Sequence, residues 1–531
     1  MKRAEDFASG IYVLAQAKEI VTSGDLSGWT VEGLKPGVRT LVGVRNGQFR
    51  LNVCGGICLV FRRGGWFGSF AHPLSRVVPL DADASDVRCA ILSATMSDIR
   101  VRFAPSPTGK VHIGNIRAAI YNWLYARHTG GKFLLRIEDT DLERSTPEAI
   151  QALLECMEWL GLDYDEPAVY QTKNLARHLA CVQQLLASGR AYECERTSRD
   201  GKTGKVIMFR MPKEGVIAYD DLVKGHMEKK AEDVQDFAIV RSDGSPIFHL
   251  ANVVDDIDQG ITHVIRGDDH VENTFKHIEL FKALGAQPPK YGHLSMIVNA
   301  QGKPYSKRDG AAFVGEFREN GYLPEALFNY LLLLGWNPGD DREVLTREEM
   351  IQLFDIEKVH VTAAKFDIKK LQWMNGEYIR RTPKEAYRAE LLKRVAAAGL
   401  AVPEGFNLDL LVDQLQIRTK FWSDIPGNCA YFFTDDYPFD EKAVEKRLKK
   451  EGVKDLLLDL ANRFEALEPF TAAAGEAMVK ELAQGQGMGP WVHPVRVAVS
   501  GRGEGIGLFE TCELLGKEKT VARLRRAANM V

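Results

Sequence analysis

The pattern of hydrophobic and polar positions divides the chain into an alternating part and a helical part. Between Met96 and about Ala300, short apolar runs alternate with helical stretches, as a parallel sheet in an α/β fold requires. The predicted strands cover 96–103, 133–137 and 263–265, and a predicted amphipathic helix covers 147–160, with a proline in its first turn.

Two further regions have different patterns. The stretch 189–254 is mixed and antiparallel-like, and Ser242-Asp243-Gly244-Ser245 predicts a turn within it. After about residue 310 the apolar spacing is close to 3.6, which predicts helices over 322–334, 386–398 and 442–464. We therefore expect an α/β region followed by a mainly helical one.

Composition limits the classes of protein that are compatible with this pattern. At 531 residues the chain is too long for one domain, and three or four are expected. Its 72 acidic and 69 basic residues give a net charge of -3, so it lacks the global basicity of a histone-like protein. Any contact with nucleic acid must use local basic patches.

Cysteine usage and the N-terminal segment carry less information. The eight cysteines form no C-x-x-C pair, which argues against a zinc knuckle or a disulfide scaffold and favours a reducing compartment. No apolar run reaches the roughly 18 residues that span a bilayer. Residues 1–95 contain no motif, and Met96 resembles a natural start, so this segment is either upstream sequence, which should pack poorly, or a separate domain.

The first candidate for chemistry is the string APSPTGKVHIG, from Ala104 to Gly114, directly after a predicted strand. Its prolines fix the backbone, Gly109 permits a sharp turn, and a helix is expected to begin near His112. The start of that helix would offer free N–H groups and a positive dipole end to phosphate. A bare His-Ile-Gly is typical of a turn with a capping histidine, but the whole string favours a nucleotide site that is neither a Walker loop nor G-x-G-x-x-G.

The second candidate is the string KPYSKR, from Lys303 to Arg308, in a stretch rich in glycine and charge. A mobile loop with Lys307 could close over a triphosphate and stabilise the charge on the leaving pyrophosphate. Alone, such a run is typical of a solvated basic loop, and only the first string favours the functional interpretation.

Together the two strings resemble the HIGH and KMSKS signatures of class I aminoacyl-tRNA synthetases. Five more resemble glutamyl-tRNA synthetase in particular: RIEDTD from Arg136, VVDD from Val253, IRGDDH from Ile265, GYLPEAL from Gly321 and WMNGEYI from Trp373. The resemblance implies a Rossmann-like class I catalytic domain with an inserted connective α+β domain, followed by an all-α region that binds tRNA and its anticodon.

The resemblance also implies boundaries. We expect an unassigned extension over 1–95 and a catalytic domain over 96–300, with a shortened connective insertion at about 187–250. A stem-contact region with the KMSKS-like loop would cover 301–385, and a helical anticodon-binding region would cover 386–531.

Roles follow for the residues that match the family's motifs. His112 and Lys307 would be catalytic. Arg102 would pair with the side-chain carboxylate of glutamate, because a bidentate guanidinium suits a planar carboxylate. ATP would be bound by Thr108, Gly109, His112, Gly114, Ser306, Lys307 and Arg308. Glutamate would be bound by Arg102, Ala104, Ser106, Glu138, Phe248, Asn252 and Arg266, with Ser106 and Glu138 at its amine and Arg266 at its α-carboxylate.

Departures from the family's pattern affect some of these roles. Phe248 stands where a tyrosine is common, and losing that hydroxyl should cost about 1 kcal/mol of substrate recognition. Pro304 replaces the usual first lysine of the loop signature, and the last HIGH position is Asn115. The segment 192–206 is shorter than in the family and holds the lone Cys194, so no zinc is expected. Whether this segment contacts the acceptor end of tRNA, as the family's insertion does, stays open. No protein metal site is expected, and Asp255-Asp256 is interpreted as a structural turn.

The implied function is that of a glutamate–tRNA ligase. ATP would activate L-glutamate to glutamyl-adenylate, with Mg²⁺ accompanying ATP, and the glutamyl group would pass to the 3′-terminal adenosine of tRNA(Glu). We expect a cytoplasmic monomer with no membrane partner. A nondiscriminating enzyme that also charges tRNA(Gln) stays open, as does a non-catalytic tRNA-binding paralogue, which Pro304 and the short insertion would favour. A shortened paralogue that modifies a tRNA base is disfavoured because it would lack the helical tail.

Basic clusters in the tail are candidate tRNA contacts, with aromatic residues beside one of them for base stacking. Such clusters are more often solvated helix faces, and such aromatics more often core, so no single tail residue is assigned. The clusters are Lys369-Lys370, Arg380-Arg381, Arg418 with Lys420, Lys446-Arg447 with Lys449-Lys450, and Arg523 with Arg525-Arg526; the aromatics are Phe421, Trp422, Tyr431 and Phe432.

Overall fold

The computed structural model describes residues 41–45, 48–53, 57–62, 98–141, 144–197, 203–485 and 487–530. The chain forms two compact units, Met1–Ser97 and Asp98–Val531. In the first unit, β1 (Leu41–Arg45), β2 (Gln48–Val53) and β3 (Ile57–Arg62) form an antiparallel sheet in that order. The rest of this unit, and the expectation that it packs poorly, lie outside the described residues. No helix of the described ranges is long and apolar enough to cross a membrane.

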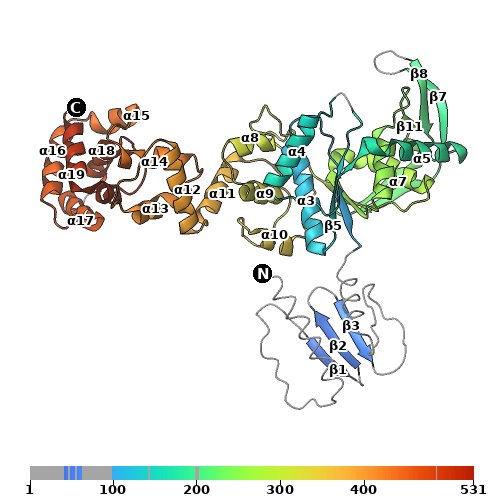
Figure 1. Ribbon diagram of the computed structural model, residues 1–531, viewed down its shortest axis with the longest axis horizontal. Coiled ribbons are helices and arrows are strands. Elements are labelled where there is room, and N and C mark those ends of the chain that lie inside the picture. The colour runs from blue at the N-terminus through green and yellow to red at the C-terminus, as the bar shows by residue number, and fades with distance from the viewer. Residues whose placement is uncertain are drawn as a thin grey trace. The chain divides into compact units, whose positions relative to one another are not determined.

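The second unit begins with the predicted alternation of strands and helices. Strands β4 (Arg100–Phe103), β5 (Lys132–Ile137) and β6 (Val169–Tyr170) form a parallel sheet in that order. Helix α3 (Ile113–Thr129) connects β4 to β5 and packs against both strands (Figure 1). Helices α4 (Pro147–Trp159) and α5 (Leu175–Ala187) follow in the chain. The parallel sheet with its crossover helix confirms the predicted α/β class.

The next segment is mixed, as its pattern predicted. Strands β7 (Ala191–Thr197), β8 (Thr203–Phe209) and β11 (Phe237–Val240) form an antiparallel sheet in the order β11-β8-β7. The hairpin of β9 (Val216–Asp221) and β10 (Gly225–Lys230) joins a second sheet, ordered β10-β9-β13-β12, with β12 (His263–Gly267) and β13 (Lys290–Leu294). The predicted turn is present, with Gly244 at a φ of +85°.

Helix α6 (Phe248–Asp258) corrects one prediction. Asp255 and Asp256 lie inside this helix and not in a turn. Its apolar residues Leu250, Val253 and Val254 recur at helical spacing and are fully buried, so this face of the helix packs into a core while both aspartates stay buried with it. The next helix, α7 (Val271–Ala283), packs on α6.

A helical segment and a short strand pair complete this half of the unit. Trp336, Tyr121, Tyr330, Phe317 and Phe328 are among its largest fully buried side chains. The elements are β14 (Ile297–Val298) paired in parallel with β15 (Ala364–Lys365), α8 (Val314–Glu319), α9 (Pro324–Leu333), α10 (Arg347–Leu353) and α11 (Ile368–Arg380). Short 3₁₀ turns are η1 (Gln171–Asn174), η2 (Ala231–Asp233), η3 (Asp268–His270) and η4 (Ile356–Lys358).

The tail is all-helical, as predicted, with one difference. The single helix expected over 442–464 is broken by a π-helical turn at Val444–Leu448 and by Gly452, whose φ of +77° interrupts the helical backbone. The tail's helices are α12 (Lys384–Ala397), α13 (Leu408–Gln416), α14 (Asp424–Phe433), α15 (Glu441–Ala443), α16 (Val453–Ala466), α17 (Ala472–Ala483), α18 (Gly489–Ser500) and α19 (Leu508–Ala528).

Candidate functional site

A cavity of about 320 Å³ lies at the carboxyl ends of β4 and β12, where ligands of open α/β sheets usually bind. It collects residues from both candidate strings, which are almost two hundred positions apart in the sequence. The first string contributes Ala104, His112 and Gly114, the second contributes Pro304 and Tyr305, and the rest of the lining includes Arg102, Asn115, Arg117, Arg266, His270, Ser295 and Met296.

His112 is the N-cap of helix α3. Its Nδ1 accepts a hydrogen bond of 3.1 Å from the Gly114 N–H, and a Cβ added to Gly114 would lie 3.3 Å from that nitrogen. Glycine therefore gives the imidazole room at this turn. Burial lowers the pKa of His112, against a hydrogen bond to the Tyr305 backbone that raises it, so the ring is neutral near pH 7.

The prediction that helix α3 begins with free N–H groups is wrong. Ile113 N donates to Ala312 O at 3.0 Å, Gly114 N to the His112 ring, and Asn115 N and Ile116 N to His112 O at 3.1 Å each. All of these donors already have partners within the protein. The helix dipole remains, but phosphate charge must be met mainly by side chains.

The second string forms a loop that is fixed at both ends. The Tyr305 ring is buried 4.4 Å from that of Phe366. Asp309 accepts hydrogen bonds from Ser306 N (2.9 Å) and Ser306 Oγ (3.0 Å) and from Asn299 Nδ2 (2.8 Å). Between these anchors Lys307 and Arg308 are exposed to solvent.

Several predicted ATP residues do not line the cavity. Ser306, Lys307 and Arg308 lie on the loop that follows the lining residues Pro304 and Tyr305. Thr108 and Gly109 are exposed on the turn after β4, and a φ of +135° at Gly109 explains the glycine there.

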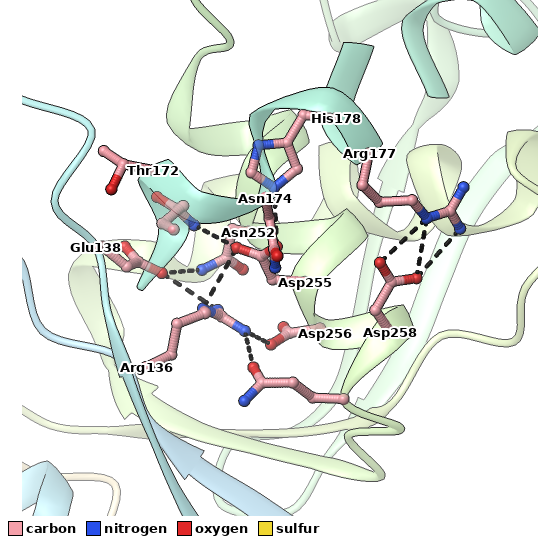
Figure 2. A network of polar contacts seen from close by, with 12 residues as sticks. Arg136, Glu138, Thr172, Asn174, Arg177, His178, Asn252, Asp255, Asp256 and Asp258 are labelled. Carbon is pink, nitrogen blue, oxygen red and sulfur yellow. Dashed lines mark hydrogen bonds and ion pairs between the residues drawn. The ribbon is translucent and has the colours of Figure 1, made fainter. Parts of the chain in front are cut away.

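Three of the predicted glutamate residues, Arg102, Glu138 and Asn252, belong to a buried ionic network, part of which Figure 2 shows. Arg102, 3% exposed, donates through Nε and Nη2 to the two oxygens of Asp256 at 3.0 and 3.4 Å. Asp256 Oδ1 also accepts from Arg136 Nη1 at 2.5 Å. Glu138 Oε1 accepts from Arg136 Nη2 at 3.2 Å and from Asn252 Nδ2 at 2.7 Å. Arg136 and Asp256, which no motif assigned to a substrate, therefore connect Arg102, Glu138 and Asn252, which are predicted to bind glutamate.

Asp255 extends this network toward α5. It accepts hydrogen bonds from His178 Nε2 (2.8 Å), Gln171 Nε2 (2.9 Å) and Asn174 Nδ2 (3.0 Å) (Figure 2). Within the described ranges, no three His, Cys, Asp or Glu side chains are placed to share a metal ion.

The two carboxyl groups nearest Arg136 have opposite net pKa shifts. Burial pushes the pKa of Asp256 upward, but the guanidiniums of Arg102 and Arg136 outweigh it and lower that pKa. For Glu138, burial outweighs the same two cations and the pKa is raised. Asp256 is thus held ionised, whereas the charge on Glu138 is disfavoured.

Arg266 is a buried cation of a different kind. It donates from Nη2 to Thr274 Oγ1 (2.8 Å) and His270 O (3.4 Å), and from Nε to His293 Nε2 (3.3 Å). Among the described residues no carboxylate forms a salt bridge with it, and burial lowers the pKa of Arg266 to about 10. An uncompensated guanidinium that lines a cavity is suited to bind an anion.

Not all of the predicted glutamate residues line the cavity. Arg102, Ala104 and Arg266 line it, whereas Ser106, Glu138, Phe248 and Asn252 do not. Phe248 begins α6, and its half-buried ring lies 5.4 Å from His249, 5.7 Å from His270 and 5.8 Å from His277.

In the tail, part of the predicted tRNA surface is core. Tyr431 and Phe432 are buried, so the interpretation that tRNA bases stack on them is wrong. Arg523 is buried too and donates to Val499 O at 2.8 Å and to Asp435 Oδ1 at 2.9 Å. The lysines at 446, 449 and 450 are exposed.

Comparison with known proteins defines the class first. Residues 98–202 and 197–373 match the catalytic domain of class I tRNA synthetases for E and Q, and residues 369–528 match an anticodon-binding domain. Together with the fold, these matches define a class I aminoacyl-tRNA synthetase.

Individual relatives narrow the family. The chain is 39% identical over 475 residues to glutamate–tRNA ligase 1 of Caldanaerobacter subterraneus subsp. tengcongensis, covering 82% of this chain and 98% of that protein. It is 41% identical over 464 residues to the glutamate–tRNA ligase of Francisella philomiragia, covering 81% and 98%. A crystal structure of a glutamate tRNA ligase from Elizabethkingia meningosepticum in complex with its amino acid matches with a TM-score of 0.72 and 31% identity, over 82% of this chain and 99% of that one. The chain belongs to the glutamate–tRNA ligase family.

Proposed function

We propose that this protein is a glutamate–tRNA ligase that binds ATP, with its Mg²⁺, and L-glutamate in the cavity at the ends of β4 and β12. The observation that carries the proposal is that both strings line one cavity, beside the buried guanidiniums of Arg102 and Arg266. A negatively charged amino acid and a polyphosphate both need such cationic walls.

Each substrate has its own side of the cavity in this proposal. Glutamate lies toward β4 and β12, with its side-chain carboxylate at Arg102, its α-carboxylate at Arg266 and its amine toward Glu138. ATP lies toward the start of α3 and the loop of Lys307. Since the first-turn N–H groups of α3 have partners within the protein, Lys307 and Arg308 must supply the positive charge that the polyphosphate needs, with the neutral His112 ring beside them.

The chemistry then follows from charge and orientation. An oxygen of the glutamate α-carboxylate attacks the α-phosphorus of ATP, and the bond to the pyrophosphate oxygen breaks. Pyrophosphate leaves with the negative charge, which Lys307 and Mg²⁺ stabilise. The 3′-terminal adenosine hydroxyl of tRNA(Glu) next attacks the acyl carbon and releases AMP. No protein nucleophile is required.

The proposal includes the expected organisation. The catalytic part would span 96–300, the stem-contact part 301–385 and the anticodon-binding part 386–531. The two matched family models meet near residue 370, inside the proposed stem-contact part. We also propose that the protein acts in the cytoplasm as a monomer. Charging assays with tRNA(Glu) and tRNA(Gln) separate a discriminating from a nondiscriminating enzyme.

Glutamate-dependent ATP–pyrophosphate exchange, with tRNA present, tests the proposal. Lys307→Ala should lower kcat about 100- to 1,000-fold, as loss of one preorganised charge donor does elsewhere. The matched control is Lys303→Ala, an exposed lysine in the same loop whose backbone N–H, not its side chain, bonds to Asn299 Oδ1 at 3.0 Å. No exchange by the unmodified protein would favour the non-catalytic paralogue, and full activity of Lys307→Ala would remove the role of Lys307.

A further inference from the structure

Behind Arg266, on the neighbouring strand, lies a buried histidine whose orientation is unusually well determined. His293 on β13 is directly opposite Arg266 on β12 in the parallel register, and its side chain is fully buried. The Arg266 Nε–H points at His293 Nε2, at 3.3 Å. Because an N–H can donate only to a nitrogen with a free lone pair, this contact requires Nε2 of His293 to carry no proton.

Asp221, the last residue of β9, fixes that tautomer. Its Oδ2 lies 2.5 Å from His293 Nδ1. Its Oδ1 accepts three backbone N–H bonds, from Val223 and Lys224 at 2.9 Å each and from His293 at 3.1 Å. A carboxylate held by this many donors stays ionised, and the hydrogen bonds to His293 and the backbone lower the pKa of Asp221 although burial opposes them. It therefore accepts a hydrogen bond from His293 Nδ1–H, which leaves Nε2 without a proton and able to accept.

Arg266 is held from two sides as a result. Thr274 Oγ1 accepts from Nη2 at 2.8 Å and lies 3.0 Å from the same His293 Nε2. With Nε and Nη2 engaged, the guanidinium plane can no longer rotate. Among the described residues no acceptor takes a hydrogen bond from its Nη1, the remaining nitrogen.

We propose that His293, oriented by Asp221, is a positioning residue that fixes the Arg266 guanidinium for the α-carboxylate of the amino acid. This rests on the proposed function, since it takes the amino acid as the ligand of Arg266. Asp221 belongs to the β9–β10 hairpin, so that hairpin contributes to the amino-acid site although none of its residues lines the cavity.

The arrangement makes binding sensitive to the charge of His293. The groups that face its ring are Asp221, Lys224, Arg266, His270, Tyr219 and Tyr291. Burial, together with the cations Arg266 and Lys224, keeps His293 neutral against the pull of Asp221, and its pKa is lowered. A proton on Nε2 would place one N–H against another and push Arg266 out of position.

Replacement of Asp221 by asparagine tests the tautomer directly. The three backbone donors keep the amide oxygen at the Oδ1 position, so the amide NH₂ must face His293 Nδ1. Nδ1 would then accept, and Nε2 would carry a proton toward Arg266, as the wrong tautomer does in other histidine–carboxylate pairs. The matched control is Asp220→Asn, the preceding residue, whose exposed carboxylate pairs with His226 at 2.8 Å.

The readout is equilibrium binding of L-glutamate to the full chain by calorimetry, with exchange kinetics beside it. Asp221→Asn should raise the Kd and KM for glutamate at least tenfold and leave the KM for ATP within twofold, whereas Asp220→Asn should change neither. His293→Gln keeps an acceptor that does not titrate, so its Kd should stay within about fivefold at pH 7.5. Because the pKa of His293 is lowered from 6.5, the Kd of the unmodified protein should rise more steeply than that of this variant as the pH falls below 6.5.

The outcomes separate this inference from the proposed function. If Asp221→Asn binds glutamate within twofold of the unmodified protein, the inference is overturned. Should Asp221→Asn fail to fold, the pH profile decides, and parallel profiles for His293→Gln and the unmodified protein overturn it equally. If the unmodified protein binds glutamate but catalyses no exchange, the proposed function fails and the inference stands. If it binds none, both fail.

Discussion

Replacement of Asp256 by asparagine should loosen helix α6 far more than its position on one helix suggests. The carboxylate is 2% exposed and receives bonds from two guanidiniums, Arg102 and Arg136. The amide would present donors to at least one of them. The carboxyl groups left near the two buried cations would be those of Asp255 and Glu138, and burial disfavours the charge on Glu138 (Figure 2).

The size of the effect follows from the burial. Removing one partner of a buried ion pair usually costs about 3–5 kcal/mol, since the remaining charge stays desolvated. Asp258, on the same helix, gives the contrast: it pairs with Arg177 at 3.1 Å, and its own side chain is 33% exposed while that of Arg177 is 48% exposed. For such a pair at most about 1 kcal/mol is expected.

Hydrogen–deuterium exchange of peptides from α6 measures the free energy of local opening of this helix. If local opening governs exchange, Asp256→Asn should speed the slowest α6 amides by about a hundredfold to several thousandfold, and Asp258→Asn by no more than about fivefold. Equal exchange in the two variants would refute the reasoning that burial, and not the mere presence of an ion pair, sets the strength of this network.

Two further predictions use carboxyl groups in other settings. Glu138→Gln should leave the free energy of unfolding in urea unchanged or raise it by up to about 1 kcal/mol, because burial already disfavours the charge. The same variant should bind glutamate about tenfold more weakly. A clear loss of stability would contradict this reasoning. Glu166, hydrogen-bonded by Arg100 and Lys132, has its pKa lowered from 4.5 to about 2. Its stabilisation is therefore present above pH 4.5 and is lost as the pH falls toward 2, so Glu166→Gln should cost about 1 kcal/mol at pH 7 and nothing near pH 2, and a cost independent of pH would contradict this.

Local patterns predicted the parts of the site that are local in the chain. The string from Ala104 to Gly114 predicted a strand, a sharp turn and a helix start near His112, and β4, Gly109 and α3 are found in those places. The prediction of free N–H groups failed for two reasons. Ala312 O, about two hundred residues away, accepts from Ile113 N, which no pattern inside the string encodes, and the ring and carbonyl of His112 accept from the N–H groups that follow.

The network behind the site could not be predicted in the same way. Arg136 and Asp256 lie within quoted strings, yet they are 120 residues apart and no spacing rule pairs them. Asp221 and His293 are 72 residues apart and lie outside every string used to assign a residue. Helix α6 did have a readable signal, the spacing of Leu250, Val253 and Val254, but the antiparallel pattern of the preceding strands masked it.

The two guanidiniums of the cavity are electrostatically unequal, and that difference bears on how an amino acid would be selected. Arg102 is already neutralised by Asp256, so a carboxylate arriving there would gain directional hydrogen bonds more than charge. Arg266 forms no salt bridge with a carboxylate among the described residues, so an anion there would gain more Coulomb attraction than one at Arg102. If the two arginines hold the amino acid as proposed, general affinity would belong to Arg266, and discrimination between a side-chain carboxylate and an amide would depend on how rigidly Asp256 and Arg136 hold Arg102.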